Sequence, residues 1–261
     1  AERDIQELVK RLADESEERK TNETSPIKEL VKPQYLKPFL IIHIFNMFQI
    51  LCGTNLFVYY SSDIISSLNQ HDNLDVNFLL VFTTGVRVFF LTISCFTLVW
   101  FDRRTICITS GAGSGAAALA IALAIYMNLF KNWFIFIMLS AYVSFNTFGF
   151  FVLPPSMIGE LLPSRIRSYA GAYIFTMNDI GMFAATKVFP FLINSAGIQG
   201  LFWIFGCSSL ICSGFLYLLL PETKDKTLVE IENYFLKKNV LWITRNKGYN
   251  EVLCIASEDR H

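Results

Sequence analysis

Residues 105–127 read TICITSGAGSGAAALAIALAIYM, without one Asp, Glu, Lys or Arg. A helix needs about 20 mostly apolar residues to cross the hydrocarbon core of a bilayer, and this stretch meets that requirement. Five further stretches are comparably apolar: Phe39–Ser61, Phe78–Phe101, Trp133–Met157, Tyr169–Ile193 and Gln199–Leu220. Strands of a membrane barrel are about 10 residues long and alternate in character, so helices are the expected form. The sequence predicts an all-α, polytopic membrane bundle of six transmembrane helices.

The composition agrees with a membrane protein. Of the 261 residues, 53% are hydrophobic and 15% aromatic, and the mean hydropathy is +0.42. Charged residues make up 17%, whereas about a quarter is usual in soluble domains. Because 22 Lys and Arg balance 22 Asp and Glu, the chain has no basic excess for nucleic acid. These values exclude a disordered, collagenous or nucleic-acid-binding chain.

Basic residues gather on one side of the predicted spans. They lie in the first tail up to Lys37, at Arg103 and Arg104, at Arg165 and Arg167, and after Leu220, whereas the opposite loops hold only Lys131. By the positive-inside rule both termini are cytoplasmic, and we expect the plasma membrane. The chain then divides into a cytoplasmic helix and linker (1–37), a six-helix transmembrane domain (38–220) and a cytoplasmic tail with a short amphipathic helix (221–261).

Small residues and prolines mark two positions within the spans. Gly111 and Gly115 are four residues apart on one face of the third span, which favours close helix packing within the chain over a dimer contact. Pro154 and Pro155 remove backbone donors from the fourth span and predict a kink there. The kink is either static or part of a conformational cycle.

Polar residues inside the spans are the candidates for a binding site. The first span carries Gln49, Asn55, Tyr59 and Tyr60, and the fifth carries Asn178. Amides and phenols donate and accept hydrogen bonds without imposing charge, which suits a neutral polyhydroxylated ligand in a wet cavity. The alternative is that they form hydrogen bonds between helices and only hold the bundle together.

Two opposite charges are deep inside the spans. Arg87 lies about nine residues, roughly 13 Å, from the outer end of its span, which is too deep for its side chain to reach the interface easily. Asp179 is near the middle of the fifth span. Ionisable groups in lipid are costly unless they are paired or hydrated. We therefore predict that Arg87 and Asp179 pair directly or share one water-filled cavity.

Three motifs then resemble the sugar porters of the major facilitator superfamily, particularly insect trehalose and hexose transporters. The first is FQILCGTN at 48–55, continuing to Tyr59 and Tyr60. The second is GELLPSRIR at 159–167, and the third is PETKDKTL at 221–228, directly after the last span. They occur in the family's order and at the matching spans. The resemblance covers nearly everything from Ser25 to about Phe235.

The resemblance implies that this chain is the second half of a twelve-helix carrier, whose partners would be a sugar or polyol, the lipid bilayer and the missing N-terminal six-helix half. It implies sugar contacts at Gln49, Asn55 and Asn178, and an outer gate at Tyr59 and Tyr60. A cytoplasmic gating network is implied by residues that latch the inner helix ends: Asp102, Arg103, Glu160, Arg167 and Glu222. Neither a cofactor nor a metal is expected.

Several positions depart from the family pattern. Ile50 replaces a second glutamine, and Asp179 stands in the substrate region where the family has tryptophan. Trehalose or glucose specificity is therefore open, and the Arg87 and Asp179 charges are compatible with a changed substrate. A non-transporting relative or truncated product, acting as a receptor or partner subunit, is the alternative. An enzyme is not expected, because His43 and His71 are isolated from any nucleophile or metal-ligand pattern.

Overall fold

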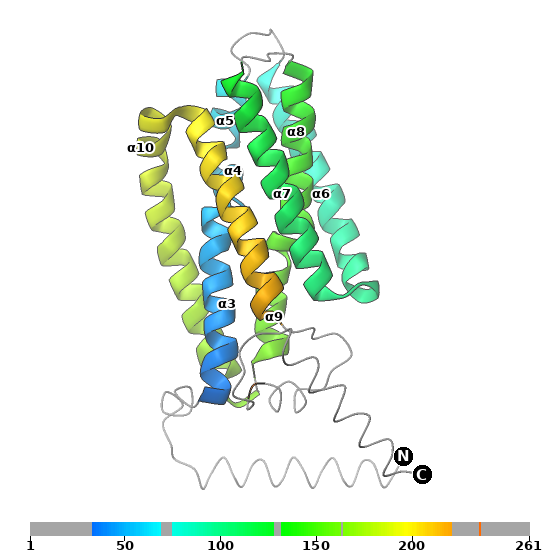
Figure 1. Cartoon of the computed structure of the whole chain (residues 1–261), viewed down its shortest axis with the longest axis vertical. Coiled ribbons are helices and arrows are strands. Elements are labelled where there is room, and N and C mark those ends of the chain that lie inside the picture. The colour runs from blue at the N-terminus through cyan, green and yellow to red at the C-terminus, as the bar shows by residue number, and fades with distance from the viewer. Residues whose placement is uncertain (1–32, 69–74, 128–131, 163, 221–234, 236–261) are drawn as a thin grey trace, which may run out of the picture.

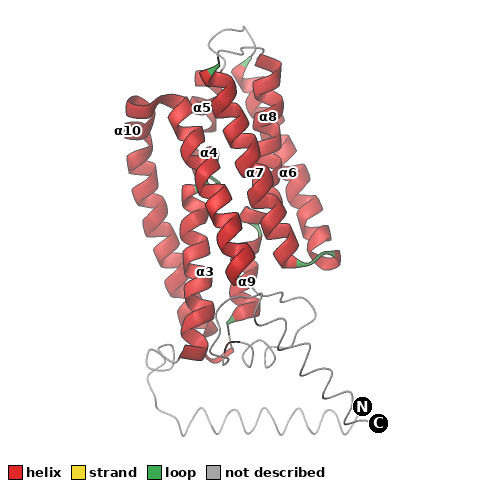
Figure 2. Cartoon of the chain, viewed as in Figure 1, coloured by secondary structure: helices red, strands yellow, loops and turns green. Residues whose placement is uncertain are grey.

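The computed structural model describes residues 33–68, 75–127, 132–162, 164–220 and 235. Every regular element in these ranges is helical (Figures 1 and 2). In chain order they are α3 (Pro33–Leu51), α4 (Leu56–Tyr59), α5 (Ser61–Leu68), α6 (Val76–Trp100), α7 (Arg103–Tyr126), α8 (Asn132–Phe145), the π-helix η1 (Asn146–Phe151), α9 (Leu153–Leu161) and α10 (Ser164–Leu219). The expected all-α membrane bundle is confirmed.

Helix α10 contains two crossings joined by a sharp reversal. Within the described residues five helical segments are long and apolar enough to span a membrane, and the last of them covers Ile166–Leu219. Its 54 residues would extend roughly 80 Å as one straight helix, far more than the hydrocarbon core. At Gly197 φ is 67°, and the helix turns back there, as Figure 1 shows. The described residues therefore contain six apolar helical segments that are long enough to cross a membrane, with the fifth and sixth where the sequence predicts them.

The spans differ greatly in how far they are covered by the rest of the chain. Helix α7 buries one face against α8 and α10, whereas α6 exposes a row of large apolar side chains that includes Val81, Phe82, Val88 and Phe89. In the spanning windows 56% of α7 is buried against 17% of α6. Exposed apolar side chains of this kind suit contact with lipid or with another membrane-embedded helix.

The glycines of α7 allow a second helix to approach closely. Gly115 lies against the side chain of Leu210 and the carbonyl of Gly206, both in the second arm of α10. Gly111 lies against the Phe150 ring and Ser213. A Cβ at either glycine would come within 3 Å of these side chains. The predicted packing of these glycines within the chain is confirmed.

Candidate functional site

The first span is interrupted between α3 and α4. Helix α3 ends at Leu51, α4 begins at Leu56, and Gly53 between them has φ of 76°. Residues with a side chain rarely adopt this left-handed backbone conformation, which glycine reaches without steric cost. The ring of Phe205 also lies where a Cβ would be, only 2.5 Å away. We call residues 52–55 the first break.

Hydroxyl groups from two other helices satisfy the carbonyls freed by the first break. Tyr142 in α8 donates its hydroxyl proton to the Cys52 carbonyl oxygen at 2.7 Å, and this bond is buried. The Ser208 hydroxyl in α10 lies 2.9 Å from the Leu51 carbonyl oxygen and 2.7 Å from that of Ile204 in its own helix, so these two carbonyls share its one proton. Backbone carbonyls cannot be left unpaired in lipid, so these two side chains make the interruption tolerable.

The fourth span is interrupted by the π-helix η1, which we call the second break. Pro154 and Pro155 follow it, at the positions whose N–H groups would otherwise bond the Phe150 carbonyl in an α-turn or a π-turn. Gln49 replaces the missing donor: its side-chain Nε2 donates to the Phe150 carbonyl oxygen at 2.8 Å. The helix is interrupted just before the prolines that predict a kink, and a side chain from α3 bonds the freed carbonyl.

Serines from α6 and α7 complete the second break. The Ser110 hydroxyl donates to the Phe145 carbonyl at 2.5 Å and accepts the N–H of Phe150 at 3.2 Å. It is thus inserted into the backbone ladder of the helix. Ser94 donates to the Phe148 carbonyl at 2.6 Å. Gly149 gives Ser110 room, because a Cβ at this position would lie 2.5 Å from that of Ser110.

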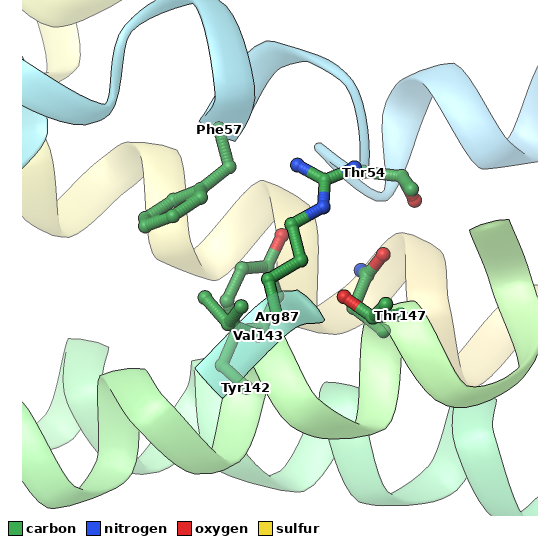
Figure 3. Close-up of a pocket in the computed structure, with 7 residues that line it drawn as sticks. Thr54, Phe57, Arg87, Tyr142, Val143 and Thr147 are labelled. Carbon is green, nitrogen blue, oxygen red and sulfur yellow. The ribbon is translucent and has the colours of Figure 1, made fainter. Parts of the chain in front are cut away.

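A small pocket lies between the two breaks, with Arg87 from α6 beside it. Figure 3 shows the Arg87 guanidinium reaching toward Thr54 of the first break and Phe57 of α4, with Tyr142, Val143 and Thr147 across from them. Asn146 completes the lining. A second cavity of about 250 Å³ shares Phe57 and Arg87 with this pocket and is lined in part by Val88, one of the exposed side chains of α6. Arg87 therefore stands at the junction of two cavities.

Arg87 does not pair with Asp179. Its guanidinium carbon lies 4.7 Å from the centre of the Phe151 ring, a cation–π contact with the second break. Asp179 is exposed on α10 and lines neither cavity at Arg87, and no ion pair joins the two residues in the described part of the chain. Sequence depth alone gave no information on which way each helix turns its charge, so the expected pairing is not found.

The other predicted binding residues line neither of the two cavities at Arg87. Gln49 is buried and holds the Phe150 carbonyl. Asn55 is half-buried at the start of α4, where its side chain makes no capping bond. Asn178 is half-buried, and its buried Oδ1 has no partner among the described residues. Tyr60 donates to the Thr186 carbonyl at 2.9 Å, tying the C-terminal end of the first span to α10.

Tyr59 and Tyr60 have different surroundings. The Tyr59 side chain is 68% exposed, whereas the ring of Tyr60 stacks on Phe189 with ring centres 4.0 Å apart. A cavity of about 180 Å³ lies beside Tyr60, Asp63 and Phe189. Of the two tyrosines expected at an outer gate, only Tyr60 has a described hydrogen bond to another helix.

The charged network expected at the cytoplasmic side is represented by one ion pair in the described residues. Arg103 Nε and Glu160 Oε1 are 2.6 Å apart, joining the start of α7 to the end of α9. Arg167 donates instead to the Leu162 carbonyl, from both Nε and Nη2 at 3.1 Å. Asp102 precedes α7 without a side-chain capping bond. Glu222 lies outside the described residues.

Comparison with known proteins identifies the family of this bundle. Residues 1–235 match the family described as "Sugar (and other) transporter". The chain belongs to the sugar transporter family. Two similar relatives are named facilitated trehalose transporter Tret1, one from Aedes aegypti and one from Culex quinquefasciatus. The first is 28% identical over 217 residues, covering 80% of this chain and 26% of the relative, and the second is 27% identical, covering 80% and 41%.

Solved sugar transporters share the fold. The proton:xylose symporter XylE bound to 6-bromo-6-deoxy-D-glucose superposes with a TM-score of 0.67 at 19% identity, covering 76% of this chain and 42% of that one. The inward-open xylose transporter XylE from E. coli gives 0.66 at 18% identity, covering 87% and 46%. The chain therefore has part of a major facilitator superfamily fold, in a family of membrane transporters and not of enzymes. It spans about a quarter to two fifths of the relatives described above.

Several residues of this sugar-transporter bundle were not singled out from the sequence. Tyr142, Ser94 and Ser110 hold the two breaks, and Asn146 and Thr54 line the pocket. Each is a polar residue in an apolar stretch, which is the available signal. Serine and threonine hydroxyls commonly bond their own helix, as Thr83 does with Leu79. The sequence pattern therefore could not separate the bridging hydroxyls from the local ones.

Proposed function

We propose that this chain supplies the C-terminal half of a carrier that moves a sugar or polyol across a membrane by alternating access. The observation that carries the proposal is the meeting of two interrupted spans around a polar pocket. Carriers place their binding sites where helices are discontinuous, because such backbone can face a cavity instead of lipid. The family match and the trehalose transport named for the relatives support a sugar as the substrate.

In this carrier Gln49, Asn55 and Asn178 would line the substrate cavity, with Tyr59 and Tyr60 at its outer side. The oxygen of the Gln49 amide can accept a sugar hydroxyl while its nitrogen holds the second break. Asn55 and Asn178 bring further amide groups, and no described hydrogen bond of the fold uses their side chains. Substrate binding would then act directly on the interrupted spans.

Opening to the two sides would be controlled at the ends of the spans. At the outer end the Tyr60 hydroxyl bond to α10 would have to break or move with the helix. At the expected cytoplasmic end the Arg103–Glu160 ion pair ties α7 to α9 and would stabilise one state over the other. The proposal includes residence in the plasma membrane with both termini cytoplasmic, which antibody access to terminal tags in intact and permeabilised cells would test.

A second six-helix half is part of the proposal. The relatives are two to four times longer than the matched stretch, and six spans leave the cavity beside α6 uncovered. The exposed Val81 and Phe89 would pack against the other half or against lipid.

Uptake by the full protein in proteoliposomes tests the function. Saturable uptake of labelled trehalose, glucose or xylose above that of protein-free vesicles is expected. Asn55→Ala should weaken it, since no described bond of the fold depends on that side chain. Asn77→Ala, at an exposed position where α6 begins, is the matched control and should leave uptake unchanged. Folded protein that binds a sugar without moving it would favour the receptor alternative, and no binding or uptake would refute both.

A further inference from the structure

The pocket between the two breaks is charged, although the sugars considered above are neutral. We propose that Arg87, Thr54 and Asn146 form a binding site for the carboxylate of a sugar acid. The proposal rests on the function proposed above and narrows its substrate class to hydroxylated organic anions. It concerns the pocket shown in Figure 3 together with the larger cavity that Arg87 joins to it.

All three side chains can direct hydrogen-bond donors to the pocket. Thr54 and Asn146 are each 4% exposed. The Oγ1 of Thr54 and the Nδ2 of Asn146 have no hydrogen-bond partner among the described residues. Arg87 adds a guanidinium, which only donates. Buried polar groups are nearly always paired in proteins, so two unpaired groups lining one pocket beside a cation indicate a missing acceptor.

The depth of Arg87 indicates a charged acceptor that is not a lipid. Arg87 lies near the middle of α6 (Val76–Trp100), so lipid phosphates at the interface are roughly 15 Å away. The Phe151 ring contributes to stabilising the cation but has no net charge. A neutral hydroxyl would accept a hydrogen bond from Arg87 and leave its charge uncompensated in a medium where that is costly. A carboxylate both accepts the bonds and balances the charge.

The sizes of the two cavities fit the two parts of such a ligand. The inner pocket offers about 10 Å³, which is room for one water-sized group such as a single carboxylate oxygen. The outer cavity of about 250 Å³ is large enough for one sugar ring. Its walls combine apolar Val58 and Leu91 with hydroxyls at Ser61 and Thr84. A ring in this cavity would have its carboxylate directed at Arg87, which both cavities share.

Glucuronate and glucose are the matched probes, because they differ only in the carboxylate that replaces the C6 hydroxymethyl group. We would measure binding of each to the full protein in detergent by calorimetry. The unaltered protein is expected to bind D-glucuronate more tightly than D-glucose. Arg87→Met should lower the ratio of glucuronate to glucose affinity by about 10- to 100-fold, the range for losing a charged hydrogen-bond partner.

Two further variants keep the test interpretable. Lys187→Met removes another cation inside the spans, whose Nζ is 5.7 Å from the Phe183 ring centre, and the affinity ratio should stay the same. Thr54→Val is nearly isosteric and should lower the ratio by about 3- to 10-fold, which allows a test even where Arg87→Met fails to fold. A ratio unchanged in both Arg87→Met and Thr54→Val, or glucuronate binding no tighter than glucose, would overturn the proposal.

The outcome is separable from that of the transport proposal. Glucose uptake with no preferential glucuronate binding would refute the carboxylate site and leave transport standing. Arg87-dependent glucuronate binding without uptake of either probe would support the site and count against transport. Glucuronate uptake that disappears in Arg87→Met and persists in Lys187→Met would support both.

Discussion

The two breaks interrupt their spans by different means. In the first break, Gly53 has a left-handed conformation that its own lack of a side chain permits. In the second, the backbone stays helical but widens to a π-turn, and Gln49, Ser94 and Ser110 from three other helices hold its carbonyls. The first break is therefore set largely by one residue of the span itself, and the second largely by its neighbours. A span can be interrupted from within or from outside, and mutations should separate the two.

The largest effect is expected where the first break depends on glycine. Gly53→Ala forces a side chain into the left-handed region and against the Phe205 ring, which together should lower the free energy of unfolding by about 2 to 5 kcal/mol. Thermal unfolding of the full protein in detergent measures it. Gly197→Ala is the matched control, because Gly197 has φ of 67° but nothing within 4 Å of a Cβ. Gly197→Ala should lower the free energy of unfolding only by the cost of the left-handed backbone, about 1 to 2 kcal/mol. Equal losses of unfolding free energy in the two variants would mean that the Phe205 ring moves aside at no cost.

A smaller effect on the free energy of unfolding is expected at Gly149, which leaves room for Ser110 in the second break. Gly149 is helical, so Gly149→Ala adds no backbone strain, but the new methyl would displace Ser110 from the ladder. We expect a loss of about 1 to 3 kcal/mol in the same unfolding assay. Gly159→Ala in α9, with open space around its Cβ, should instead be neutral or slightly stabilising. If both variants behaved alike, the close approach of Ser110 would not hold the π-turn.

Removing one outside donor from each break compares them directly. Tyr142→Phe removes the hydroxyl that donates to the Cys52 carbonyl. Gln49→Leu removes the amide that donates to the Phe150 carbonyl, and the prolines at 154 and 155 have no N–H to replace it. Each should lower the free energy of unfolding by about 1 to 2 kcal/mol. Tyr126→Phe, whose ring is 70% exposed, is the control and should change it little. A harmless Gln49→Leu would show that the prolines alone set the second break.

The smallest effect concerns the ion pair beyond the second break. Arg103 and Glu160 side chains are each 24% exposed, so Arg103→Gln should lower the free energy of unfolding by about 0.2 to 1 kcal/mol. The difference from the unaltered protein should shrink when salt is raised, because exposed charges are screened. Thermal unfolding at low and high salt tests this. A loss that does not change with salt would assign the effect to packing instead of charge.

The positions of the spans could be predicted well from the sequence. Helix α7 spans Arg103–Tyr126, and the predicted third span is Thr105–Met127, since the charges at 102–104 mark its edge. Apolar length and charge placement act locally, and they decide where a chain enters the bilayer. Gly53 lay hidden in the apolar run of the first span, because nothing in hydropathy separates a glycine that breaks a helix from one that packs within it.

The chemistry of the pocket depended on contacts between distant parts of the chain. Pro154 and Pro155 mark the place where the fourth span is interrupted, but the π-turn before them needs Gln49, which is 101 residues away from Phe150. Arg87 was correctly identified as deep in its span, yet its contact is the Phe151 ring and not Asp179. Which face of a helix meets which neighbour follows from packing the whole bundle, and a single sequence does not record it.

The reversal at Gly197 decides how this end of the bundle can be labelled. The two arms of α10 meet there at one residue, so no loop separates them. A protease could not bind this turn, and an epitope could not be inserted in it, without displacing a helix. A single added cysteine at the exposed Ser195 is small enough, once the exposed Cys95 and Cys207 and also Cys254 of the tail have been replaced. Its reaction with a membrane-impermeant maleimide added outside intact cells would then report which side of the bilayer the corner faces.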